Sequence, residues 1–210
     1  MQVRKQTLVV ALVGAFVMAA GSAALAQNQL TNPGFESGLA GWTAFGNAYA
    51  ESSNPPQFVP RSGNGLASMF GNWWGVFNVS GIFQEFATAP GEVWEMSSSA
   101  RHWSSDAMIG VGAPDQNWVV QKIAFFDASQ EIGGVESTIL SGTFATDVWH
   151  DAATIVGVAP AGTVKLQALI LYLQPLYDGG AAHIDDVSLV HRVPVATEPS
   201  TWGRVKALYR

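Results

Sequence analysis

Apolar and polar residues alternate in several segments of the chain. The clearest segments are residues 92–103, 119–127, 163–174 and 183–190. In the first, Trp94 and Met96 share one face, while Glu95 and Arg101 share the other. Successive side chains of a β-strand point to opposite faces, so a period of two predicts strands. In the last segment the alternation predicts that Val187 and Leu189 share the phase of Asp185.

Clusters of Gly, Pro, Asn and Asp separate these segments. The clusters are residues 54–56, 62–65, 89–91, 133–134, 159–162 and 178–180. Such clusters are typical of tight turns. Short strands at this spacing, without helical periodicity, predict an all-β protein, an antiparallel β-sandwich of the jelly-roll type.

The first 26 residues have the pattern of a cleaved export signal. Arg4 and Lys5 precede an apolar run over residues 8–20, and Ala24-Leu25-Ala26 is a small-residue cleavage motif. The apolar run is shorter than the roughly 20 residues that cross a bilayer. We therefore expect a signal peptide over residues 1–26 and a protein that is secreted or held at the cell surface.

The rest of the chain divides into a domain and a tail. Residues 27–192 have the length of one domain. Pro194 and Pro199 set off residues 193–210, a linker and a short basic, aromatic C-terminal tail. The tail is either a sorting or attachment signal or an amphipathic end folded back on the domain.

Composition excludes some kinds of ligand and of stabilisation. The chain has no cysteine, so neither disulfides nor thiolate-bound metals hold the fold. Its net charge of −6, with few Lys and Arg, argues against nucleic acid, whose phosphates require clustered positive charge. Its eight tryptophans suit both stacking on neutral sugar rings and a hydrophobic core.

Three stretches together resemble a known family. Residues 28–38 with Gly41-Trp42, residues 81–86 with 90–94, and residues 183–189 are similar to the first strand, the central hairpin and the closing strand of carbohydrate-binding modules. The modules are those of families four, nine and twenty-two, a jelly-roll group with a galactose-binding-domain-like fold. The resemblance implies a non-catalytic module that binds a polysaccharide.

The resemblance also implies a structural calcium ion. Glu36 and Asp185 match the family's carboxylate ligands, and residues 62–65 match the loop that supplies carbonyl oxygens. Asp186 is the alternative ligand if a bulge shifts the strand phase. Calcium requires six to eight oxygen ligands. The other interpretation is that backbone N–H groups or Arg61 satisfy the two carboxylates without a cation.

Sugar binding requires exposed aromatic rings beside polar groups. Trp73 and Trp74 are adjacent between turn residues, and alternation sends adjacent side chains to opposite sides, so we expect one of them to be exposed. The other candidates, drawn from the polar faces of residues 95–103 and 120–126, are Glu95, Arg101, Trp103, Lys122 and Phe126. We expect these to line a groove, whereas Trp42, Trp94 and Trp149 are expected in the core.

Two classes of function remain after these observations. The sequence contains no nucleophile elbow, no HExxH motif and no P-loop, and its four histidines lack metal-ligand spacing, so we expect no enzyme activity. The first class is a secreted carbohydrate-binding module. The alternative is an extracellular structural or adhesive protein that uses the same fold for protein contacts.

Overall fold

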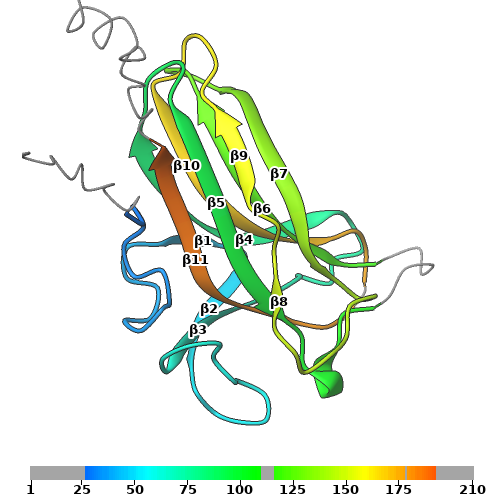
Figure 1. Ribbon diagram of the computed structural model, residues 1–210. Helices are drawn as coiled ribbons and strands as arrows, with labels where there is room; N and C mark the ends of the chain where they lie inside the picture. Colours follow the sequence, from blue (N-terminus) through cyan, green and yellow to red (C-terminus); the bar gives the residue numbers. More distant parts are fainter. Residues whose placement is uncertain (1–26, 110–115, 178, 193–210) are drawn as a thin grey trace, which may run out of the picture.

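The computed structural model describes residues 27–109, 116–177 and 179–192, and these form two antiparallel sheets packed face to face (Figure 1). One sheet has, in order, β1 (Thr43–Phe45), β4 (Asn78–Ala87), β10 (Lys165–Gln174), β6 (Trp118–Phe126) and β7 (Glu131–Ser141). The other has β2 (Asn47–Ser52), β3 (Gly65–Phe70), β11 (Ala182–Arg192), β5 (Val93–Arg101) and, both paired to β5, β8 (His150–Asp151) and β9 (Ile155–Val158). The predicted β-sandwich is confirmed.

Helical structure plays almost no part in the fold. The 3-10 helix η1 (Ser104–Asp106) follows β5. The described residues contain no helix that is long and apolar enough to span a membrane. The predicted export signal over residues 1–26 and the tail over residues 193–210 lie outside the described residues, so both stay predictions.

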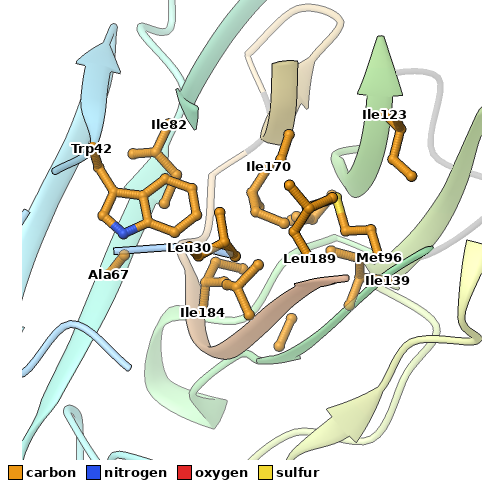
Figure 2. Close-up of a cluster of buried hydrophobic side chains, with 14 of the residues drawn as sticks. Leu30, Trp42, Ala67, Ile82, Met96, Ile123, Ile139, Ile170, Ile184 and Leu189 are labelled. Carbon is orange, nitrogen blue, oxygen red and sulfur yellow. The ribbon is translucent and has the colours of Figure 1, made fainter. Parts of the chain in front are cut away.

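The core fills the space between the inner faces of the two sheets. In β10 every second residue is buried, from Leu166 to Gln174, as alternation requires. Figure 2 shows Ile170 of β10 and Ile82 of β4 in the same buried cluster as Ile184 and Leu189 of β11. Each such side chain contributes about 1.5–3 kcal/mol when it is fully buried. Trp42 and Trp94 belong to this core, as predicted, whereas Trp149 is only partly buried and lies outside it.

One polar side chain bridges the sheets inside this core. Gln121 of β6 is fully buried, and its Oε1 accepts a hydrogen bond from Ser98 Oγ of β5 at 2.8 Å. Its Nε2 donates to Ser137 Oγ at 3.1 Å and to the Ala153 carbonyl at 2.7 Å. Because every polar atom of this amide has a partner, it fixes the register of the two sheets without a large desolvation cost.

The closing strand has a bulge that the sequence pattern did not locate. The four strands predicted from alternation correspond to β5, β6, β10 and β11. In β11 the pairing with β5 shifts between Asp185 and Ser188. Ile184 and Val187 consequently both face the core, and Asp185 points to the outer face. The prediction that Asp185 shares a phase with Val187 is therefore wrong.

Two other segments differ from the strands that the resemblance implied. Residues 28–42 run mainly through turns, in which Asn32 and Phe35 have φ of 51° and 57°. They join the sandwich through an isolated bridge between Asn28 and Val190. The expected central hairpin is absent, because β4 and β5 belong to different sheets.

Loops cover part of the outer face of the six-stranded sheet. The ring of Phe58 packs on His183 of β11 with centroids 5.2 Å apart, and Trp149 Nε1 donates to the Val59 carbonyl at 3.1 Å. This cover buries Arg101, His102 and His183, which are each 3% exposed or less. Burial next to the Arg101 guanidinium lowers the pKa of His183 to about 4.

The buried His183 predicts acid sensitivity. Its pKa is lower in the folded chain than the usual 6.5 of the unfolded one. Between these pH values the unfolded state binds more protons, so the free energy of unfolding falls as the pH falls from 6.5 to 4, by up to about 3 kcal/mol. Urea unfolding of the protein and of His183→Gln across this range measures the difference. If the free energy of unfolding changes equally with pH in the two proteins, the pH dependence does not come from His183.

Candidate functional site

The β3–β4 loop, residues 71–77, carries exposed aromatic side chains. Trp73 is 46% exposed, Trp74 is 71% exposed and Phe77 is 58% exposed. Trp73 and Gly75 have φ of 54° and 72°, so the loop holds two left-handed residues within three positions. The prediction that one of the paired tryptophans is exposed is confirmed, and the second is half-exposed.

A cluster of side-chain amides fixes the conformation of this loop. Gln174 Oε1 accepts hydrogen bonds from the Trp73 N–H at 2.8 Å and from Asn78 Nδ2 at 2.9 Å. Asn47 Nδ2 donates to the Gly71 carbonyl at 3.0 Å and to Asn72 Oδ1 at 2.7 Å, and Asn78 Oδ1 accepts from the Asn72 N–H at 3.1 Å. Gln174 is fully buried at the end of β10. The loop is therefore held from the sheet and presents its aromatic residues in a set position.

The two tryptophans of the loop differ in what their rings contact. The ring of Trp73 stacks on Phe70, with centroids 5.4 Å apart and planes 27° apart. Phe70 in turn stacks on Tyr49 at 5.7 Å. One face of Trp73 is thus already covered. Within the described part of the chain Trp74 makes no ring contact, so its indole is the freer surface for a ligand.

Two further segments bring aromatic rings to the same end of the sandwich. Tyr177, 63% exposed, lies in the β10–β11 loop, and its phenol packs against Gly75, where a Cβ would be 2.1 Å from Oη. The rings of Phe77 and of Trp118 in β6 have their centroids 6.5 Å apart. Figure 1 shows the β3–β4 and β10–β11 loops side by side. We call this set the aromatic patch: Tyr49, Phe70, Trp73, Trp74, Phe77, Trp118 and Tyr177.

The aromatic patch continues onto the outer face of the five-stranded sheet. On this face Leu173 of β10 lies between its cross-strand partners Val79 of β4 and Trp118 of β6. Two residues along β10, Leu171 lies in the same way between Gly81 and Val120. Further along, charged residues form ion pairs, with Lys122 Nζ 2.8 Å from Glu131 and Lys165 Nζ 2.8 Å from Glu85. The face is therefore apolar next to the patch and polar at its far end.

The groove predicted from residues 95–103 and 120–126 does not form. Glu95 and Arg101 lie on the outer face of the six-stranded sheet, whereas Lys122 and Phe126 lie on the outer face of the five-stranded sheet. The core separates the two pairs. Alternation shows which residues of a strand share a face, but it does not show which sheet the strand joins.

The residues predicted to bind sugar on the six-stranded sheet instead contact other parts of the protein. Arg101 is buried and donates to the Gln57 carbonyl at 3.0 Å and to Asp147 Oδ1 at 3.3 Å. Glu95 pairs with Arg192 at 2.6 Å. Trp103 is partly buried where the chain enters η1. The sequence could not reveal that Tyr49, Phe77 and Tyr177 belong to the aromatic patch, because long-range packing brings them together.

The residues predicted to bind calcium receive hydrogen bonds from backbone amides. Asp185 is fully buried and accepts from the N–H groups of Arg61 at 2.8 Å, Ser62 at 3.1 Å and Asp186 at 2.7 Å. Burial raises its pKa above the usual value. Glu36 accepts from the N–H groups of Asn64 and Gly65.

The groups around Glu36 and Asp185 can be compared with those that a cation requires. The loop is the one that the resemblance indicated, but it turns N–H groups rather than carbonyl oxygens toward both carboxylates. Converging N–H groups stabilise anions and repel cations, so the donors as arranged do not fit a calcium ion between Glu36 and Asp185. No cluster of three or more acidic or His side chains able to hold a metal occurs among the described residues. The arrangement favours the cation-free interpretation, and the predicted calcium stays to be tested.

Comparisons with known proteins support the fold. No protein-family model matches the sequence, and no curated protein matches it. Among solved structures, a family 61 carbohydrate-binding module in complex with β-1,4-galactotriose matches with a TM-score of 0.52 and 16% identity, over 79% of this chain and 99% of the module. A Clostridium thermocellum xylanase structure with a family 22 module, complexed with xylohexaose, matches with a TM-score of 0.50 and 14% identity, over 83% of this chain and 30% of the xylanase.

Solved enzymes also have a similar fold. A cyclase from Fischerella sp. TAU matches with a TM-score of 0.50 and 11% identity, over 78% of this chain and 95% of the cyclase. The fold alone therefore does not separate binding from catalysis. The chain has the jelly-roll β-sandwich fold found in carbohydrate-binding modules.

The calcium prediction can be tested through Asp185. In Asp185→Asn an amide NH₂ replaces one acceptor oxygen and faces N–H donors, so we expect the free energy of unfolding to fall by about 1–3 kcal/mol. If backbone amides alone satisfy the carboxylate, Asp185→Asn loses the same stability in thermal unfolding with calcium as with chelator. A calcium-dependent rise in Tm that Asp185→Asn abolishes would instead establish the ion.

Proposed function

We propose that the protein is an exported, non-catalytic module that binds a polysaccharide through the aromatic patch. The observation that carries the proposal is the set of exposed rings, led by Trp74, on a loop that buried amides hold in place. An exposed indole presents a flat apolar face to the C–H groups of a sugar ring. Because the loop is already ordered, little conformational entropy is lost on binding.

The surroundings of the patch favour an uncharged ligand. Its loop, residues 71–77, contains no charged side chain. On the adjoining sheet face Lys122 and Lys165 are paired with carboxylates, and Lys165 also lies 5.5 Å from the ring of Phe126. A chain that extends from the patch along this face would meet the Gln167 amide and the Lys122 ammonium as hydrogen-bonding groups for its hydroxyls.

Trp74→Ala tests the proposal. We expect the variant to bind its polysaccharide roughly tenfold or more weakly, as for an exposed aromatic anchor, and to keep its stability within about 0.5 kcal/mol. The measurement is retention of the purified protein on cellulose, xylan and β-1,4-galactan, followed by thermal unfolding. Trp73→Ala should lower both affinity and stability, because Trp73 also packs on Phe70.

Phe144→Ala is a matched control, because Phe144 is a partly exposed aromatic residue (37%) that packs on His150 outside the patch. We expect this variant to bind like the unmodified protein. If no polysaccharide retains the folded protein, or if Trp74→Ala binds as the unmodified protein does, the patch does not bind sugar. The first of these results would turn attention to the structural or adhesive alternative.

A further inference from the structure

A separate cavity of about 230 Å³ lies on the six-stranded sheet. Its lining includes Ser97 of β5, Asp151 of β8, Thr154, and the side chains of Arg61 and Asp186. Ser97 is on the outer face of β5, so the cavity opens on the side of the sandwich opposite the outer face of the five-stranded sheet. None of these residues belongs to the aromatic patch.

Irregular pairing along β5 creates this cavity. β8 pairs with β5 at Ser99 and Ala100, and β9 pairs with it at residues 93–96. Between these two ladders one backbone hydrogen bond, from the Ala152 N–H to the Ser98 carbonyl, continues the sheet. On the other side the bulge in β11 gives Asp186 a φ of 49° and directs its side chain to Arg61. The outer face of β5 is therefore left uncovered at Ser97.

The charges around the cavity disfavour a charged ligand. The Arg61 guanidinium lies between two carboxylates, with Nη2 3.0 Å from Asp151 and Nη1 2.7 Å from Asp186. An anion would approach these two carboxylates and be repelled. A cation would have to compete with the guanidinium that already pairs with both carboxylates. A neutral ligand meets neither the repulsion nor this competition.

The hydrogen-bonding groups of the cavity suit a ligand with several hydroxyls. Ser97 Oγ and Thr154 Oγ1 make no side-chain hydrogen bond within the described part of the chain. Hydroxyls both donate and accept. The Asp151 carboxylate already accepts from Arg61 and from Ser99 Oγ at 2.7 Å, but its side chain is 67% exposed, so its remaining lone pairs are accessible. The volume is below the roughly 300–1,000 Å³ of drug-sized sites, which suits a small ligand.

We propose that this cavity is a second binding site, which takes a single unit of a neutral sugar through its hydroxyls. Asp151 accepts hydrogen bonds from the sugar, Arg61 orients the two carboxylates, and Ser97 and Thr154 complete the contacts. The cavity lies apart from the aromatic patch, so if both bound sugar the chain would engage two segments of one glycan with raised avidity. The proposal does not depend on the aromatic patch binding sugar.

Backbone amide NMR tests the second site. The purified, ¹⁵N-labelled protein is titrated with D-glucose, D-galactose, D-xylose and D-mannose in separate experiments. We expect one of these sugars to shift the amide signals of residues 97–99 and 151–154. Ser97→Ala should weaken this binding roughly fivefold, as for one lost hydrogen bond.

Trp74→Ala is the control that separates the two sites. It should leave the titration at residues 97–99 unchanged, whatever it does to polysaccharide retention. The proposal is overturned if no sugar shifts these signals at millimolar concentration, or if Ser97→Ala, with an otherwise unchanged spectrum, binds as tightly as the unmodified protein. Saturable shifts of the same signals by calcium chloride or by inorganic phosphate, with none by sugar, also overturn it.

Discussion

The structure depends on the burial of the two inner sheet faces against each other. The chain has no cysteine, so no disulfide limits the unfolded state, and apolar packing must provide most of the stability. The central strands β10 and β11 lie in the middle of their sheets: β10 buries every second residue, and β11 buries its first four residues as well as Val187 and Leu189. A fold held in this way tolerates variation in its loops, provided that their backbone groups are satisfied.

The polar residues at the borders of the core link the fold to its surface chemistry. Gln174 ends the buried row of β10 and, in the same position, accepts the Trp73 N–H that sets the aromatic loop. Asp185, the last residue of β11 in regular register before the bulge, accepts hydrogen bonds from the N–H groups of the loop at Arg61 and Ser62. The next residue, Asp186, then reaches Arg61 beside the cavity on the six-stranded sheet. Both candidate sites thus lie where a strand ends or breaks its regular pairing.

The sequence predicted the fold class well but only part of the arrangement of the candidate site residues. Local alternation located β5, β6, β10 and β11, because the side chains of a strand alternate whatever its partners are. Partner choice is not local, so Glu95 and Lys122 were wrongly expected in one groove although their strands lie in different sheets. The bulge after Asp185 was also hidden, because one extra residue leaves no distinct sequence signal. The exposure of the Trp73-Trp74 pair was foreseen, because alternation does not bury two adjacent bulky rings.

The measurement that tests the account most directly is an NMR titration of the tryptophan indole N–H signals with a soluble oligosaccharide of a retained polysaccharide. If the aromatic patch binds sugar, the signal of Trp74 shifts most and that of Trp73 less, while the buried Trp42 and Trp94 stay in place. An unmoved Trp74 signal at saturating oligosaccharide would contradict the account, because the most exposed indole would then lie outside the binding surface.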